Sequence, residues 1–297
     1  MNAAGNINVN APITVQHSGG GLALNYGGNG GNIGTIPAVG TNYHLNAPIS
    51  FTAASGGSLS INGANYTLLR TIAAIDNIDV TGLSGNYALA NSINASGTTY
   101  NGPLVGSLAS SFRGQFTGLG HIIDGLSVLG TNSNGTGLFG AVGTFGSLVG
   151  VVRNLGLTNL TMNGNARFCV GGLVGINYGT INNVFTSGTV SNNSTSTGGL
   201  VGNNYGNISN SYSSANVSGT GSYYGGIAGI NYGGSINAVY ASGSITGGSN
   251  VGALIGGSTT SSSKNGSLTN SYWDSYSTGQ ANAAGSAGPI VQFNAVS

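Results

Sequence analysis

The sequence predicts an all-β protein, and more specifically a right-handed parallel β-helix with about three short strands in each coil. Three observations predict it: glycine occupies 57 of 297 positions, only five basic and four acidic residues are present, and a glycine-rich sequence unit recurs at a constant step. An interior glycine destabilises a helix by about 1 kcal/mol relative to alanine. A helical protein is therefore excluded, and the repeat excludes a disordered chain of the same composition.

The repeat is clearest in a five-residue glycine-rich block. GGLVG begins at positions 171 and 198, GGIAG begins at 225 and GALIG begins at 252, so successive blocks start at a constant step of 27. A looser relative, GLFG, begins at position 137, and Gly234 is a one-residue insertion within the third unit. The apolar and aromatic positions that recur with the block are Leu173, Leu200, Ile227 and Leu254, then Ile181, Ile208 and Ile236, then Phe185, Tyr212 and Tyr240.

Each unit contains three short runs separated by Gly, Asn and Ser, which supply the backbone conformations of tight turns. A unit of this size cannot bury its own apolar side chains, so successive units must stack to form one core. We expect a single continuous solenoid over 1–297, with irregular coils in 1–136, repeat coils in 137–256 and an array-terminating segment in 257–297. In the first part, alternating apolar and polar residues predict strands, and a glycine cluster predicts a loop. These strands lie at 7–10, 13–15, 59–62 and 78–80, and the loop at 27–34.

Stacking in register also explains the shortage of charge. Equivalent side chains of successive coils lie about 4.8 Å apart, where like charges repel but asparagine amides and aromatic rings stabilise one another. A net charge of +1 gives no field for nucleic acid or for an anionic membrane surface, and no apolar run is long enough to span a bilayer. We therefore expect no nucleic-acid partner and no direct membrane insertion.

Four blocks, taken in their order along the chain, resemble a known family. They are Asn86–Ser96 (NYALANSINAS), Phe112–Ile123 (FRGQFTGLGHII), the GGLVG-x-NYG units, and Ser271–Asp274 (SYWD) followed by Gly279-Gln280. Together they are similar to the GLUG-repeat arrays of filamentous-haemagglutinin-like exoproteins of two-partner secretion systems. The resemblance covers about residues 60 to 280.

The resemblance implies a secreted protein of the Gram-negative bacterial surface that acts as an adhesin. It implies two partners, an outer-membrane secretion partner and a host-cell receptor or glycan. The chain has no signal peptide pattern and lacks the Asn-Pro-Asn motifs of the family's export domain, so we expect an internal or C-terminal fragment. The alternatives left open are a β-helical lyase or glycosidase, a haem-acquisition exoprotein and a structural spacer.

We expect no enzymatic activity, no cofactor and no metal site. The only carboxylates close in sequence are Asp76 and Asp79, which would face opposite sides of a strand, and the same holds for His121 and Asp124. The histidines and Cys169 are not spaced as metal ligands, and we expect that cysteine to be a small buried residue.

The remaining candidate for ligand contact is a row of tyrosines. Tyr178, Tyr205 and Tyr232 follow Asn and precede Gly at the same constant step as the glycine-rich blocks, which predicts an aromatic ladder. An exposed ladder would contact a sugar or a protein partner. Because a turn is predicted there, a packing role is favoured.

Overall fold

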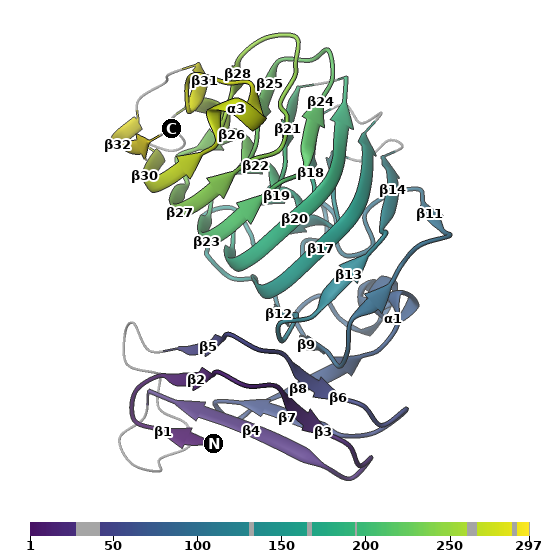
Figure 1. Ribbon diagram of the computed structural model, residues 1–297. Coiled ribbons are helices and arrows are strands. Elements are labelled where there is room, and N and C mark those ends of the chain that lie inside the picture. The colour runs from purple at the N-terminus through teal and green to yellow at the C-terminus, as the bar shows by residue number, and fades with distance from the viewer. Residues whose placement is uncertain are drawn as a thin grey trace.

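The protein is mostly β-structure, with 55% of residues in strands and 5% in helices. The computed structural model describes residues 1–27, 42–130, 134–164, 168–193, 195–259, 266–286 and 290–296. Figure 1 shows successive long strands side by side through the middle and C-terminal parts, with the N-terminal strands at one end.

In the repeat region each unit contributes to three parallel sheets. The first and second sheets hold five and six strands, and the third belongs to a larger sheet of seventeen strands. The first complete unit consists of β18 (Cys169–Gly171), β19 (Val174–Asn177) and β20 (Thr180–Asn192). The following units consist of β21 (Ser196–Gly198), β22 (Val201–Asn204), β23 (Asn207–Ser213) and β24 (Asn216–Ser218), then β25 (Tyr223–Gly225), β26 (Ala228–Tyr232) and β27 (Ser235–Ala241), then β28 (Val251–Gly252), β29 (Ile255–Thr259) and β30 (Gly266–Trp273).

The pairing register follows the repeat. Val174 pairs with Val201, and Val201 pairs with Ala228, in parallel and at the step of the glycine-rich blocks each time. Ile208 pairs with Ile236, one position later than this step, so the chain absorbs Gly234 before the next rung begins. The step of the repeat is thus the length of chain from one rung to the next.

The third strand of the earlier units is longer than predicted. β17 (Val151–Gly164) and β20 have 14 and 13 residues, whereas three short strands per coil were expected. Both remain one strand through a residue with positive φ, Asn154 in β17 and Asn183 in β20, each with φ 53°. Asn tolerates this left-handed conformation, so the chain bends within the strand without leaving the sheet.

Upstream, shorter strands build the preceding rungs. β12, β13 and β14 pair in parallel with successive parts of β17, and they in turn pair with β9, β10 and β11. β15 and β16 start the other two sheets by pairing with β18 and β19. Their bounds are β9 (Asn86–Leu89), β10 (Ile93–Asn94), β11 (Thr99–Tyr100), β12 (Gln115–Thr117), β13 (Ile122–Asp124), β14 (Ser127–Gly130), β15 (Gly135–Thr136) and β16 (Phe139–Val142).

The first eight strands include one antiparallel pair. β2 pairs with β5, β3 with β6 and β4 with β7, all in parallel, whereas β7 and β8 form a hairpin across Asn62 and Gly63, which both have positive φ. These φ values suit a tight two-residue hairpin turn. The bounds are β1 (Asn2–Ala3), β2 (Ile7–Val9), β3 (Ile13–Val15), β4 (Gly21–Tyr26), β5 (Tyr43–Leu45), β6 (Ile49–Phe51), β7 (Ser58–Ile61) and β8 (Ala64–Leu69).

Of the strands expected in this part, those at 7–10, 13–15 and 59–62 are confirmed as β2, β3 and β7. The strand expected at 78–80 is wrong, because Ile78–Thr81 is the short helix α2, preceded by α1 (Ile72–Asp76). Thr71 begins α1 as its N-cap, with its hydroxyl accepting a hydrogen bond from the backbone N–H of Ala74. Apart from Gly27, the loop expected at 27–34 lies outside the described residues.

At the C-terminal end the stack continues past the last repeat. β30 pairs with β27, β31 (Ala284–Ser286) with β29 and β32 (Ile290–Val296) with β30. Between them lies α3 (Ser275–Thr278), which Asp274 caps through two backbone N–H groups. The indole Nε1–H of Trp273 donates a hydrogen bond to the carbonyl of Gln280. This bond joins the SYWD segment to the Gly279-Gln280 pair, the two parts of the last sequence block that carries the family resemblance.

The core runs along the inside of the stack. The leucine and isoleucine positions of the repeat are all at most 1% exposed and belong to one cluster of buried apolar side chains. They are Leu173, Leu200, Ile227 and Leu254 in the corner before the second sheet, and Ile181, Ile208 and Ile236 in the third sheet. Burying each such side chain contributes roughly 1.5–3 kcal/mol.

Candidate functional site

The outer face of the third sheet carries a row of aromatic side chains. Phe185 pairs with Tyr212, Tyr212 with Tyr240 and Tyr240 with Tyr272, on β20, β23, β27 and β30. The three tyrosines are 43%, 41% and 52% exposed, although their neighbours on the other side of the sheet are buried. We call these four residues the outer aromatic row.

A backbone feature accompanies each ring. Two residues before it, the chain has positive φ, with Asn at three of the four positions and Ala238 at the other. The values are 53° at Asn183, 50° at Asn210, 53° at Ala238 and 50° at Asn270. The bend repeats from rung to rung, so the rings that follow it keep the same position on the face.

Polar side chains form a second line on the same face, three residues before the rings. Asn182 donates to the hydroxyl of Ser209 at 2.8 Å, and the hydroxyl of Thr269 donates to the amide oxygen of Asn237 at 2.9 Å. Both lines are uncharged. The face thus offers aromatic surface beside amides and hydroxyls, the combination that binds neutral polar ligands.

At its upstream end the row begins with a ring over a glycine. Phe185 stacks on Tyr212 with ring centroids 5.0 Å apart and an interplanar angle of 3°. Its partner on the other side is Gly156, where a Cβ would overlap the phenyl ring. Phe185 therefore occupies the space that a side chain at position 156 would fill.

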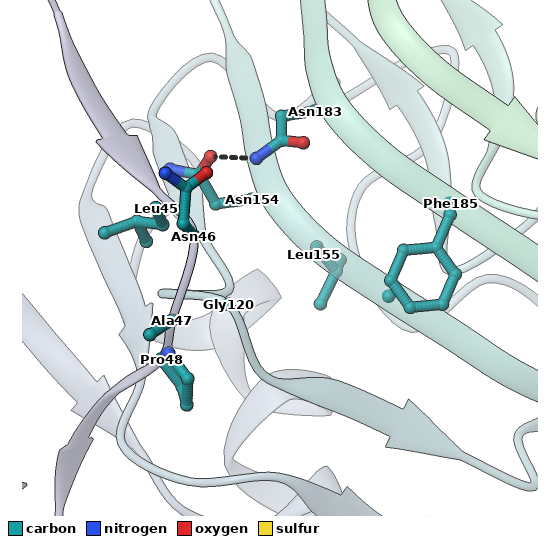
Figure 2. Close-up of a pocket in the computed structure, with 10 residues that line it drawn as sticks. Leu45, Asn46, Ala47, Pro48, Gly120, Asn154, Leu155, Asn183 and Phe185 are labelled. Carbon is teal, nitrogen blue, oxygen red and sulfur yellow. Dashed lines mark hydrogen bonds between the residues drawn. The ribbon is translucent and has the colours of Figure 1, made fainter. Parts of the chain in front are cut away.

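A pocket of about 210 Å³ lies at this end of the row. Figure 2 shows the ring of Phe185 and the side chain of Leu155 on one side, and Ala47 and Pro48, from the segment between β5 and β6, on the other. The pocket is lined by Leu45, Asn46, Ala47, Pro48, Gly120, Asn154, Leu155, Gly156, Asn183 and Phe185. It carries no charged side chain.

The tyrosines singled out from the sequence form a different ladder. Tyr178 and Tyr205 have ring centroids 4.8 Å apart, and Tyr205 and Tyr232 stack at 4.7 Å with an angle of 6°. Phe145 packs edge-on against the first two, and all three tyrosines are half-buried. Burial raises the pKa of each of their hydroxyls. The ring faces are turned toward one another, so the rings of this ladder pack mainly against each other.

Cys169 lies behind this ladder, where it is 2% exposed. Burial raises the pKa of its thiol to about 12, against a smaller opposing effect of the hydrogen bond with Ser196. The thiolate that nucleophilic chemistry requires is therefore not populated near neutral pH. The prediction of a small buried residue is confirmed.

The residues weighed for catalysis do not come together. His121 is buried with Nε2 2.9 Å from the carbonyl oxygen of Ile49, whereas Asp124 accepts hydrogen bonds from Thr158 at 2.6 Å and Asn159 at 2.7 Å. These two bonds hold the pKa of Asp124 below its ordinary value. Neither residue bonds the other.

Asp76 and Asp79, the second candidate pair, were expected on one strand. This expectation is wrong, because Asp76 lies in α1 and Asp79 lies in α2. The carboxylate of Asp79 accepts a hydrogen bond of 2.7 Å from the backbone N–H of Gly106, which gives it a structural partner. Within the described part of the chain, His, Cys, Asp and Glu form no group of three that could hold a metal ion. None of the helices in that part is long and apolar enough to cross a membrane.

Sequence reasoning missed two features of this site. Tyr272 was recognised only within the SYWD block, because a step of 32 residues separates its strand from the one before and hides the periodicity. The signal that identifies it is local: Asn270, like Asn183 and Asn210, stands two residues before an aromatic ring. The pocket was missed because it joins segments that lie far apart along the chain.

Known proteins resemble this chain in its sequence repeat and in its fold. Residues 193–218 match the family model described as the GLUG motif. Halomucin of Haloquadratum walsbyi is 36% identical over 133 residues, which cover 42% of this chain and 1% of that protein. A putative Gly-rich membrane protein of Evansella cellulosilytica is 36% identical over 129 residues, which cover 40% of this chain and 14% of that protein. The matching region thus spans only a small part of either relative.

Among solved structures, a putative immunoglobulin A1 protease from Bacteroides ovatus is similar, with a TM-score of 0.54 and 24% identity. The match covers 70% of this chain and 75% of that one. At this identity the likeness extends to the fold alone. The chain therefore carries a GLUG repeat within mostly parallel β-structure.

Proposed function

We propose that this chain is a non-enzymatic segment of a surface adhesin, a rigid right-handed parallel β-helix that contacts its target through the outer aromatic row. The observation that carries the proposal is the row itself: three tyrosines, 41–52% exposed, in register on a neutral face. Tyrosine supplies a large contact area at low conformational entropy cost, and it is enriched among residues that dominate binding. A row repeated from rung to rung suits polyvalent contact.

The relatives support a surface location. One is named a halomucin and the other a Gly-rich membrane protein, and the matches to them cover 42% and 40% of this chain. The target we propose is a host-cell receptor or a glycan. We also propose that the stack is right-handed and that the protein is exported through an outer-membrane secretion partner of a Gram-negative bacterium.

The absence of enzymatic activity is also proposed, on the grounds that Asp79 and Asp124 are engaged in structural hydrogen bonds. A glycosidase needs two carboxylates flanking the scissile bond. Replacement of Asp76, Asp79 and Asp124 by Asn would abolish polysaccharide cleavage by an enzyme and leave an adhesin unaffected.

The proposal is tested by binding of the purified chain to a glycan array and to cultured cells. The variant Tyr212→Ser/Tyr240→Ser/Tyr272→Ser should lose binding at least tenfold. The matched control is Tyr276→Ser, which removes a tyrosine that is 94% exposed but outside the row, and which should bind as the wild type does. Binding should change little between low and high salt, because few charges are present to be screened.

Equal binding by the triple variant would overturn the role of the row. No binding by the wild-type chain to any cell or glycan would favour a structural spacer instead. A strong loss of binding in salt would require a charged contact surface, which the outer aromatic row does not provide.

A further inference from the structure

We propose that the pocket at the upstream end of the outer aromatic row anchors one aliphatic side chain of a partner protein, whose extended and uncharged segment lies beside residues 42–48 on the same face. The inference rests on the proposed attachment function, because it names a protein segment as the target class for a site that adjoins the contact row. It is carried by an interface that the chain already makes with this face, by the packing of Phe185, and by the size and polarity of the pocket.

The first step concerns an interface within the chain. The polar line of the outer face continues upstream from Asn182 to Arg153 and Thr117, which pair in register. Residues 42–48 lie over these upstream rungs: the hydroxyl of Tyr43 donates to Thr117 at 2.9 Å, and Arg153 lies over the Tyr43 ring, 4.1 Å from its centroid. Thr117 is only 1% exposed. The upstream end of the outer face is therefore already covered by a segment of polypeptide.

This cover ends at the pocket, and the face continues beyond it. Pro48 lies so close to Gly120 that a Cβ on that glycine would be 3.1 Å from the Cα of Pro48. Asn154 is 4% exposed beside this segment, whereas Asn183, its equivalent on the next rung, is an exposed residue. A second extended segment placed beside 42–48 would continue an existing interface onto the exposed rungs of β20 and β23.

The second step concerns the part of Phe185 that borders the pocket. Tyr212 covers one face of the ring at 5.0 Å, and the other face packs on the backbone of Gly156, with Ile122 beside it. The edge of the ring is thus the part left to line the pocket. A sugar needs a ring face, because its C–H groups meet the negative π-surface there. Contact between a ring edge and an aliphatic side chain has no such directional requirement, since the hydrophobic effect is non-directional.

The third step concerns size and charge. The volume of about 210 Å³ is below the roughly 300–1,000 Å³ of pockets for drug-sized ligands, so the pocket suits a single side chain. Leu45, Ala47 and Pro48 line one side, and Leu155 and Phe185 line the other (Figure 2). No lining residue is charged. A charged side chain would lose its hydration there without gaining a counter-ion, which favours an aliphatic one.

The fourth step concerns the main chain of the partner segment. Asn183 donates to Asn154, and Asn46 donates to Asn10, each at 2.8 Å. These bonds orient the exposed amides of Asn46 and Asn183 at one end of the pocket and leave their oxygens able to accept. An extended polypeptide presents N–H donors along its length, and those that become covered need acceptors. The site therefore combines an apolar anchor with polar contacts around it, as the central residues of protein interfaces do.

The test uses the purified chain and a phage-displayed library of random dodecapeptides, selected on the wild type after depletion on Ala47→Trp. That variant fills the pocket from its partly exposed rim. We expect the enriched peptides to be uncharged and to share an aliphatic residue. A synthetic copy, titrated by fluorescence anisotropy, should bind Ala47→Trp about tenfold or more weakly than the wild type, because a buried anchor supplies much of the binding energy. Replacement of the shared aliphatic residue by Ser should weaken binding to the wild type similarly.

The matched control is Ala54→Trp, which makes the same change at an exposed position outside the pocket and should leave binding unchanged. Thermal unfolding of each variant identifies any loss that is due to misfolding, and Ala47→Lys, which places a charge at the rim, keeps the test valid if Ala47→Trp does not fold. Failure to enrich any peptide that distinguishes the wild type from Ala47→Trp would overturn the inference. Displacement of the bound peptide by cellohexaose or chitohexaose would assign the pocket to a glycan and would overturn it as well.

The outcomes separate this inference from the proposed function. If cell attachment requires the tyrosines of the row but no peptide depends on the pocket, the side-chain anchor is wrong and the attachment function stands. If a peptide binds in the pocket but cells attach equally to the triple tyrosine variant, the anchor stands and the row is not the contact surface.

Discussion

The side-chain amide of Asn177 donates a hydrogen bond of 2.8 Å to the side-chain oxygen of Asn204 in the next coil, and both side chains are completely buried. Asn204 continues the ladder by donating to Asn231 at 2.9 Å. Each also bonds the backbone of the turn that follows it, Asn177 as acceptor from Gly179 and Asn204 as donor to Gly206. The ladder therefore fixes the register of the coils and the shape of the turn together.

Asn204→Ala should lower the free energy of unfolding by about 2–3 kcal/mol. The substitution removes the acceptor of the 2.8 Å bond from Asn177, which keeps only a longer bond of 3.4 Å to the carbonyl of Asn207, and it removes the donor to the oxygen of Asn231. An unsatisfied buried polar group destabilises by roughly 1–3 kcal/mol. Urea unfolding followed by circular dichroism measures the change. Ser218→Ala, at an exposed position in the same unit, should stay within about 0.5 kcal/mol of the wild type. A similar small change for Asn204→Ala would show that the ladder does not stabilise the stack.

Gly199→Ala tests why the chain is so rich in glycine. A Cβ at Gly199 would overlap the carbonyl oxygen of Gly226 in the next coil and the side chain of Ser213, and the equivalent Gly172 faces the carbonyl of Gly199 in the same way. We expect a loss of about 3 kcal/mol, because overpacking of a close contact typically destabilises by 1–3 kcal/mol and here the obstacle is backbone. Thermal unfolding would show the loss as a lower Tm.

The control for that substitution is Gly19→Ala. No atom lies within 4 Å of the position of its Cβ, so the change should leave stability unchanged or raise it slightly. If both alanine variants behaved alike, the spacing between coils would not be what requires glycine.

These contacts also indicate what the sequence could predict. The constant step of the repeat was visible because Asn204, Gly199 and Ile208 each lie against their own equivalents, so their residue types repeat. Side-chain identity was much less informative where coils differ in length. α2 was taken for a strand because Ile78, Asp79 and Val80 alternate apolar and polar residues, which three residues of a helix also do.

The candidate site was less predictable than the fold for a related reason. The rings of the outer aromatic row are exposed because the backbone bends at Asn183 and its equivalents. In a regular strand successive side chains point alternately inward and outward, and the bend shifts this alternation by one residue. The pocket depends on the approach of Pro48 to Gly120, which no local pattern encodes.

Ala238 provides a test of that bend. Its φ of 53° lies in the left-handed region, which is unfavourable by roughly 1 kcal/mol for a residue with a Cβ and no polar side chain. Ala238→Asn, the residue of the equivalent position in the three other strands, should raise the free energy of unfolding by about 0.5–1 kcal/mol, and Asn210→Ala should lower it by a similar amount. Ala54→Asn, in an exposed loop without positive φ, should give no increase. Stabilisation by Ala54→Asn but not by Ala238→Asn would refute the explanation.

His121 should make the stability of the protein depend on pH between 7 and 5. Burial lowers the pKa of its imidazole below the ordinary value of 6.5, and the hydrogen bond to the carbonyl of Ile49 opposes this only in part. Because the unfolded chain then takes up the proton more readily than the folded chain, stability is complete above about pH 6.5 and is lost as the pH falls below it. The Tm of the wild type should therefore fall between pH 7 and 5, and His121→Gln should remove that dependence. His44→Gln, which changes an exposed histidine, should leave the fall in place.

Asp124 and Asp274, whose pKa values are lowered by their hydrogen bonds, lose stabilisation only at still lower pH, so they do not contribute in this range. An equal fall in Tm for the wild type and His121→Gln would show that the buried imidazole is not the group responsible.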